Sequence, residues 1–215
     1  MSLAAPSPLS RRLFLGALCL TPLAGRASAA ALPVITVLGD SITAGYGLHE
    51  GEAVPAQLKA SLARLGAPAQ VRAAGVSGDT SAGGLARVDF SVQPDTALCI
   101  VALGGNDLLQ GLDPRSTRTN LQAIVRRLKA RRIRVLLCGL RAPPLLNAGF
   151  AREFNAVFPA VARDEGVALY PDLLAGVAMS RALNQRDGIH PNAAGVKVIV
   201  GRLAPFAVRA LRARA

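Results

Sequence analysis

Short apolar runs alternate with longer amphipathic stretches along most of the chain. The apolar runs predict buried strands at residues 34–38, 70–73, 97–103, 135–140 and 168–170. The amphipathic stretches predict helices at residues 53–65, near 81–90, and at 116–130, 150–165 and 193–211. Strands that alternate with helices are typical of a parallel sheet covered by helices. We therefore expect one α/β domain, a three-layer αβα sandwich with a mostly parallel, doubly wound, five-stranded sheet.

The first 29 residues have the pattern of an export signal. Arg11-Arg12 precede an apolar stretch from Leu13 to Leu23, and Ala27-Ser28-Ala29 form a small-residue cleavage site. The sequence predicts a signal peptide at residues 1–29 and a mature domain at 30–215 that is periplasmic or secreted. The paired arginines fit the twin-arginine export route, and the ordinary Sec route stays open.

Composition restricts the class of protein. Hydrophobic residues make up 51% of the chain and charged residues 18%, which excludes an intrinsically disordered protein because enough apolar surface exists to form a core. No apolar run reaches the roughly 18 residues that a membrane-spanning helix needs, so we expect no stable membrane insertion. We expect a monomer.

The net charge is +12, and the 25 basic residues are 22 arginines and only 3 lysines. Nucleic-acid binding would need an aromatic stacking platform or a recognition helix, but six Phe, two Tyr and no Trp are scattered singly. We therefore expect no nucleic-acid partner. The densest basic run, residues 126–134, ends a predicted helix, which favours a solvated helix end over binding to anionic lipid.

Four polar clusters follow the predicted strands or precede the last predicted helix. They are Gly39-Asp40-Ser41, residues 75–79, Gly104-Gly105-Asn106-Asp107 and residues 187–192. In doubly wound sheets, ligands bind at the carboxyl ends of the strands. We therefore expect all four clusters to meet at one edge of the sheet.

The chain contains only two histidines, His49 and His190, and a general base that works near neutral pH is most often histidine. Asp187 precedes His190 by three residues, in a turn that can aim its carboxylate at one ring nitrogen and leave the other facing a nucleophile. His49 has no such neighbour. Ser41, at a strand-to-helix turn, is the candidate nucleophile.

A serine nucleophile also needs hydrogen-bond donors for the developing oxyanion. The candidate donors are the backbone N–H groups of Ser41 and Gly75 and the side-chain amide of Asn106. Each taken alone has a plainer explanation, because Gly and Asn after strands are usually turn residues. Their order and location favour the catalytic interpretation.

These clusters closely resemble the SGNH, or GDSL, hydrolase family, and within it the bacterial periplasmic arylesterase, acyl-thioesterase and lysophospholipase type. Gly39-Asp40-Ser41 matches the first block of that family, Gly75 the second, residues 104–107 the third and residues 187–192 the last. The resemblance implies a flavodoxin-like sheet, Ser41, Asp187 and His190 as catalytic residues, and Ser41, Gly75 and Asn106 as the oxyanion hole. Ile42 replaces the Leu that commonly follows the serine.

Other chemistries lack their motifs. Thr43 stands where the Gly-x-Ser-x-Gly nucleophile elbow needs glycine, and no nucleotide-binding Gly-rich fingerprint occurs. Cys99 and Cys138 lie in predicted strands and are expected to be free thiols, so we expect neither a zinc site nor any cofactor. We expect Asp40 to bond its own turn backbone and Asp107 to cap a helix.

The predicted substrate is a small acyl ester or thioester, including lysophospholipid. Leu108, Leu109 and Leu112 follow Asn106 closely and are candidates for an acyl-chain wall, with a plain capped loop as the alternative. The loop at residues 141–147 is less typical of the family and leaves the substrate preference open. Two alternatives remain: a carbohydrate O-deacetylase, and a non-catalytic periplasmic binding protein on the same fold.

Overall fold

The computed structural model describes residues 1–2, 31–143 and 146–213. Apart from its first two residues, the predicted signal peptide lies outside the described residues, so that assignment stays a prediction. From Leu32 onward the chain forms one compact α/β unit. Within the described ranges, no helix is long and apolar enough to cross a membrane.

Five parallel strands form one sheet with the order β2-β1-β3-β4-β5. This is the doubly wound order of flavodoxin-like folds, and it confirms the predicted fold class. The ends of the strands differ from the predicted ends by one or two residues. The strands are β1 (Val34–Gly39), β2 (Gln70–Gly75), β3 (Thr96–Ala102), β4 (Arg134–Cys138) and β5 (Ala168–Tyr170).

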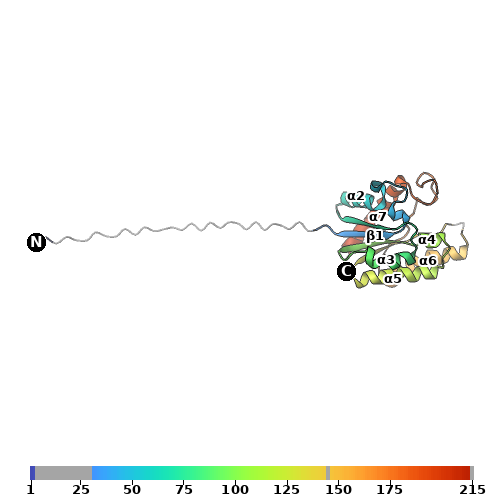
Figure 1. The fold of residues 1–215 in the computed structure, drawn as a ribbon, viewed down its shortest axis with the longest axis horizontal. Helices are drawn as coiled ribbons and strands as arrows, with labels where there is room; N and C mark the ends of the chain where they lie inside the picture. The colour runs from blue at the N-terminus through green and yellow to red at the C-terminus, as the bar shows by residue number, and fades with distance from the viewer. Residues whose placement is uncertain (3–30, 144–145, 214–215) are drawn as a thin grey trace. The chain divides into compact units, whose positions relative to one another are not determined.

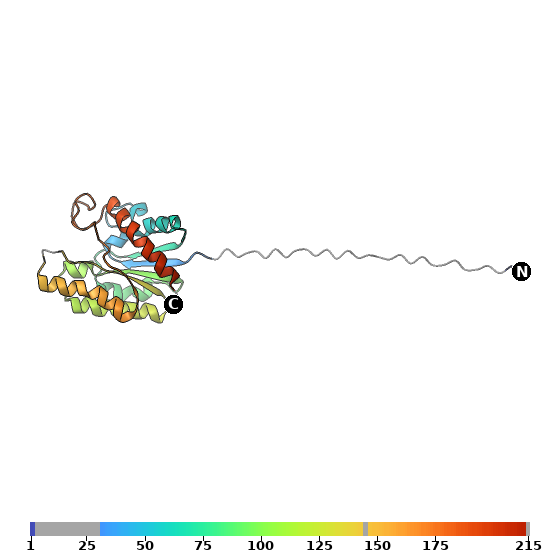
Figure 2. The same ribbon diagram turned by 180° about the vertical axis from the view of Figure 1, so that it is seen from behind.

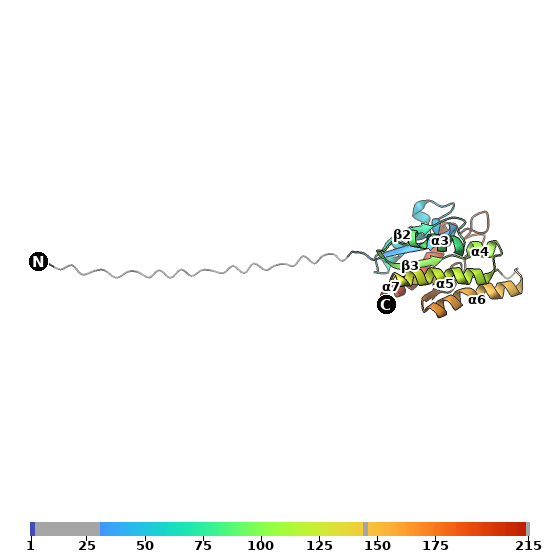
Figure 3. The same cartoon turned by 60° about the horizontal axis from the view of Figure 1, so that its bottom comes forward.

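Helices cover both faces of the sheet. On one face, α2 (Val54–Arg64) packs against α7 (Ala193–Arg212), which crosses the sheet in the reverse view (Figures 1 and 2). On the other face lie α3 (Ser81–Ser91), α5 (Pro114–Ala130) and α6 (Ala148–Glu165), with α5 and α6 side by side (Figure 3). Three short helices were not predicted: α1 (Ser41–Ala44), η1 (Glu50–Glu52) and α4 (Gly105–Leu109).

The apolar periodicity of α5 explains why this segment is a helix on a sheet face. Leu121, Ile124, Val125 and Leu128 recur at helical spacing, and all four are buried. Asp113 caps the first turn by accepting the Arg115 N–H. The helix therefore buries its apolar stripe as the sequence predicts, although it begins at Pro114, two residues before the predicted start.

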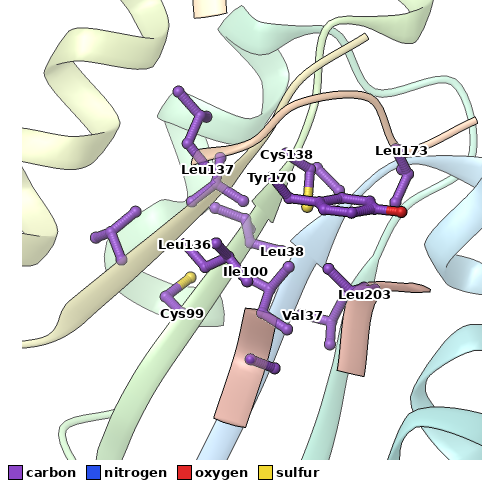
Figure 4. Close-up of a cluster of buried hydrophobic side chains, with 14 of the residues drawn as sticks. Val37, Leu38, Cys99, Ile100, Leu136, Leu137, Cys138, Tyr170, Leu173 and Leu203 are labelled. Atoms are coloured by element: carbon purple, nitrogen blue, oxygen red, sulfur yellow. The ribbon is translucent and has the colours of Figure 1, made fainter. Parts of the chain in front are cut away.

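The core lies along β1, β3 and β4, whose side chains are buried on both faces of the sheet (Figure 4). Cys99 and Cys138 are part of this core, and both are free thiols as predicted. Burial raises the pKa of Cys99 to about 12 and raises the pKa of Cys138 further. Both thiols are therefore protonated and inert at neutral pH.

The strands next to β1 end level with it. Gly39, the last residue of β1, pairs with Gly75 of β2 and with Ala102 of β3. A Cβ atom on Gly39 would lie 2.7 Å from the Ala102 carbonyl oxygen, so the strands can approach this closely only with glycine at this position. The segments that follow these three strands consequently start side by side at one edge of the sheet.

Candidate active site

Ser41 is held at this edge by the turn that starts α1. Asp40 has extended backbone angles and acts as the N-cap, because its carboxylate accepts the Ile42 N–H at 3.0 Å. This is the structural role predicted for Asp40. Burial is the main cause that raises the pKa of Asp40, to about 6. Ser41 is the first residue of α1 and is largely buried, with 9% of its surface exposed.

Asp187 and His190 lie in a loop that is closed at its base. An antiparallel bridge joins Asn184 to Pro191, and Gly188 turns the chain with a φ of +71°. The Asp187 carboxylate accepts the backbone N–H groups of Ile189 at 2.9 Å and of His190 at 3.0 Å. These bonds hold the carboxylate beside the imidazole ring, as the three-residue spacing predicts.

The three predicted catalytic side chains form one hydrogen-bonded chain. Ser41 Oγ lies 2.9 Å from His190 Nε2, and His190 Nδ1 lies 2.6 Å from Asp187 Oδ2. The imidazole and backbone N–H bonds lower the pKa of Asp187 to about 2. The carboxylate therefore stays ionised at neutral pH and favours the tautomer with the proton on Nδ1, which leaves Nε2 free to accept a proton from Ser41.

Two residues that the sequence analysis did not select join the serine turn to the histidine loop. The Tyr46 ring packs on the His190 ring with centroids 4.6 Å apart. The Gln185 amide donates to the Tyr46 carbonyl at 2.7 Å and to the Pro191 carbonyl at 3.1 Å. No local sequence signal marks Gln185.

Asn106 lies in α4, at the end of β3, rather than in an open turn. Its side-chain amide donates to the Asp79 carbonyl at 2.8 Å, which fixes the plane of the amide while the second N–H stays available. Asp79 belongs to the segment that follows β2. The structure thus brings the predicted oxyanion donor Asn106 to the segment after Gly75.

Gly75 ends β2 and packs closely against α1. A Cβ atom there would lie 2.5 Å from the Ala44 nitrogen, which is sufficient reason for glycine at this position. Gly78, with a φ of +85°, precedes the Asp79 residue that anchors Asn106. Gly78 is therefore a second candidate backbone donor, which the sequence analysis did not select.

Asp107 has a structural role. Its buried carboxylate accepts the backbone N–H of Ser81 at 2.7 Å, the Ser81 hydroxyl at 2.5 Å and the Thr117 hydroxyl at 3.0 Å. It therefore caps a helix, as predicted, but the helix is α3 and the capped residue is 26 positions away. This carboxylate joins α3, α4 and α5 beside Asn106.

We expect Asp107→Ala to lower the free energy of unfolding by about 3 kcal/mol, because it leaves buried donors of Ser81 and Thr117 without an acceptor. Asp113→Ala is the matched control, since Asp113 caps α5 from an exposed position and its loss should cost only about 1 kcal/mol. Denaturant unfolding of both variants measures the difference. Equal losses would contradict the role assigned to Asp107.

The other predicted residues take different positions. Leu108 packs partly against the core, whereas Leu109 and Leu112 are 61% and 37% exposed beside the site. His49 is exposed at the start of η1, where its backbone N–H donates to the Glu52 carboxylate at 3.2 Å. In the ranges that the structure describes, no three His, Cys, Asp or Glu side chains gather as the ligands of a metal would.

The fold and the hydrogen-bonded Ser-His-Asp chain define a class, the three-layer α/β serine hydrolases. Residues 37–198 match the GDSL-like lipase/acylhydrolase family model. The protein therefore belongs to this family, and it is an SGNH-type hydrolase of acyl esters or thioesters. The predicted family is confirmed, and neither alternative function is favoured.

Relatives agree with this classification. Esterase TesA of Pseudomonas aeruginosa is 40% identical over 163 residues, which cover 75% of this chain and 81% of the relative. The thioesterase 1/protease 1/lysophospholipase L1 of Escherichia coli K12 is 36% identical over 165 residues, covering 76% of this chain and 78% of the relative. The crystal structure of AlinE4, an SGNH-hydrolase family esterase, superposes with a TM-score of 0.71 at 45% identity, covering 86% of this chain and all of AlinE4.

Proposed function

We propose that the protein hydrolyses its substrate through an acyl-enzyme on Ser41. Ser41 Oγ attacks the acyl carbonyl while His190 Nε2 accepts the serine proton, and His190 then returns that proton to the leaving alcohol or thiol. A water molecule, deprotonated by His190, attacks the acyl-enzyme and releases the carboxylic acid. The observation that carries this proposal is the continuous chain from Ser41 through His190 to Asp187.

The oxyanion of each tetrahedral intermediate is held by fixed N–H donors in this proposal. These donors are the backbone N–H groups of Ser41 and Gly75 and the side-chain amide of Asn106. The N–H of Gly78 is the alternative to that of Gly75, and the pairing of β1 with β2 favours it, because the Gly75 N–H faces away from β1. The bond from Asn106 to the Asp79 carbonyl supports the proposal, because it leaves one amide N–H of a fixed side chain unused.

The proposed substrates are acyl esters and thioesters of small alcohols and thiols, with lysophospholipid among them. The names of the relatives, esterase TesA and thioesterase 1/protease 1/lysophospholipase L1, support this range. Leu109 and Leu112 offer exposed apolar side chains for an acyl chain. Since Ser41, His190 and Asp187 come from one chain, we propose that the enzyme acts as a monomer.

Hydrolysis of p-nitrophenyl acetate, butyrate and octanoate and of an acyl-coenzyme A thioester by the purified mature chain tests the proposal. Turnover of butyrate or octanoate, with the acyl group trapped on Ser41 by rapid quench, is the expected result. Turnover of acetate alone would instead indicate a deacetylase, and no turnover of any substrate would indicate a binding protein. A lysophospholipid assay then tests the finer substrate assignment.

We further propose that the protein is exported and acts in the periplasm or outside the cell. The segment with Arg11-Arg12 and Ala27-Ser28-Ala29 supports this proposal. We expect the exported protein to begin at or near Ala30, as N-terminal sequencing of a periplasmic fraction will measure. An uncut chain that starts at Met1 or Ser2 in the cytoplasmic fraction would contradict export.

A further inference from the structure

Arg87 lies on α3, which packs beside β1 (Figure 1). Only 18% of its side chain is exposed. Its guanidinium group reaches four groups from separate segments of the fold. It donates to Asp79 Oδ2 at 2.5 Å, to the Ala74 carbonyl at 2.8 Å, to the Gly39 carbonyl at 2.8 Å and to Ser91 Oγ at 3.1 Å.

The bond to the Ala74 carbonyl holds the end of β2. In the parallel pairing of β1 with β2, Gly39 lies opposite Gly75 and its carbonyl accepts the Val76 N–H, so the Ala74 carbonyl faces β1. A trans peptide group is planar, so its N–H points opposite to its C=O, and the Gly75 N–H faces away from β1. The Ala74 bond therefore fixes the last peptide group of β2, from which the segment with Gly78 and Asp79 continues.

The bond to Asp79 acts on the proposed oxyanion donor Asn106. The Asp79 carboxylate is held by Arg87, and the Asp79 carbonyl accepts the side-chain amide of Asn106. The segment that positions Asn106 is thus anchored by the same guanidinium that holds the end of β2. Gly78, the alternative backbone donor, is the residue directly before Asp79 and is anchored with it.

The bond to the Gly39 carbonyl adds the third segment. Gly39 precedes the Asp40-Ser41 turn, and its carbonyl also accepts the Val76 N–H at 3.1 Å. Arg87 therefore ties the end of β1, the end of β2 and the following segment into one unit. Only arginine presents several N–H donors in a fixed plane, because the ammonium group of lysine is a single point on a flexible stem.

We propose that Arg87 is a positioning residue for the oxyanion hole, acting through Asp79 on Asn106 and Gly78 without touching the substrate. This inference rests on the proposed function of those donors. It extends that function to a residue that no sequence motif marks, because Arg87 is only one of the 22 arginines in the chain.

The first test replaces Arg87 with lysine and compares steady-state kinetics on p-nitrophenyl butyrate. We expect Arg87→Lys to lower kcat about 10- to 100-fold with KM within about twofold, because misplaced donors weaken only transition-state binding. Asp79→Asn weakens the bond to Arg87 but keeps the shape of the side chain and the backbone carbonyl. It should lower kcat by a smaller factor, again with little change in KM. Active-site titration measures the concentration of functional enzyme in each preparation, and each kcat is calculated from that concentration.

Arg131→Lys is the matched control. Arg131 also binds a backbone carbonyl, that of Val92, and lies near Asp89 with 26% of its side chain exposed, but it sits at the opposite edge of the sheet. Its replacement should change melting temperature without changing kcat per active site. Equal kcat losses in both variants would contradict the inference, because the effect would then be one of general stability.

Phenylboronic acid provides a readout that a purely structural role would not change. Addition of Ser41 Oγ to its boron atom gives a tetrahedral anion that resembles the oxyanion intermediate. We expect the inhibition constant of Arg87→Lys to rise by about the same factor as kcat/KM falls. An unchanged inhibition constant beside a reduced kcat would overturn the inference.

A double-mutant cycle with Asn106→Ala separates this inference from the proposed function. If Arg87 acts through Asn106 and its neighbours, Arg87→Lys should reduce kcat less in the Asn106→Ala background than in the wild type. Fully additive losses would overturn the inference and leave the proposed function intact. Wild-type activity that survives Asn106→Ala unchanged would instead contradict the proposed oxyanion hole itself.

Discussion

Replacing His190 with alanine is expected to lower kcat/KM by about 10⁴- to 10⁶-fold, because the proposed mechanism has no other group to accept the Ser41 proton. Ser41→Ala should have an effect of similar size. His49→Ala is the matched control, since His49 is exposed and its bond to the Glu52 carboxylate comes from its backbone N–H, which alanine keeps. Kinetics on p-nitrophenyl butyrate measure all three variants. Equal losses from the two histidine substitutions would contradict the assignment of the base.

The kcat/KM of the wild-type enzyme should decrease as the pH is lowered. An imidazole accepts a proton only when it is neutral, so kcat/KM should fall as the pH drops from about 7 towards about 5 and His190 becomes protonated. Asp187 cannot cause this fall, because its pKa of about 2 keeps it ionised throughout that range. The wild-type profile measured from about pH 5 to 9 tests the prediction.

Asp40 is the competing source of such a fall, since burial raises its pKa to about 6. Asp40→Asn keeps an oxygen that can accept the Ile42 N–H and removes the titrating carboxylate. We expect this variant to retain the loss of kcat/KM at low pH. Disappearance of the pH dependence in Asp40→Asn would show that the carboxyl group, and not the imidazole, controls the acid limb.

Asn106→Ala is expected to lower kcat by about 10²- to 10³-fold, equivalent to about 2.7 to 4 kcal/mol of transition-state stabilisation. KM should be nearly unchanged, because the ground-state carbonyl is bound more weakly than the oxyanion. Asn106 is the proposed donor best suited to this test, since the others are backbone groups that substitution cannot remove cleanly. The variant also loses the bond to the Asp79 carbonyl, so a modest fall in melting temperature accompanies the kinetic effect.

Asn120→Ala is the control for that stability effect. The Asn120 amide donates one hydrogen bond, at 3.0 Å to Ser81 Oγ, from α5 and has no part in the proposed reaction. It should lower melting temperature by a similar amount and leave kcat within a few-fold of the wild type. If Asn106→Ala behaves like Asn120→Ala in both measurements, Asn106 is only a structural residue of α4.

Most of the sheet could be predicted because its central strands are buried on both faces. Such strands appear in the sequence as short apolar runs, and their period and length are local properties. The edge strand β2 was the hardest to delimit. It carries Gln70 and Arg72 and ends two residues later than the apolar pattern indicates. The residues that follow the strands could be assigned to one edge because parallel strands end together.

The three unpredicted short helices have a different explanation. α1 and α4 are four and five residues long, which is too short for an apolar period to be recognised. Each starts directly after a buried strand, where a cap residue and packing against neighbouring elements decide the conformation. Gly104 enters α4 with a φ of +114° and lies beside the Phe158 ring, a contact between segments 54 residues apart.

The sequence by itself determined the α/β class, the polar ends of the strands and the residue types of a serine hydrolase, since each depends on short-range patterns and on the scarcity of histidine. Only the tertiary structure decided which groups meet there. It placed the Asp107 carboxylate at the first residue of α3, and it added the Gly78 N–H to the candidate backbone donors of the oxyanion hole. It also placed Arg87 against the ends of two strands. The physical reason is that a hydrogen bond between distant residues depends on the order of the strands and the packing of helices on them, which local periodicity does not encode.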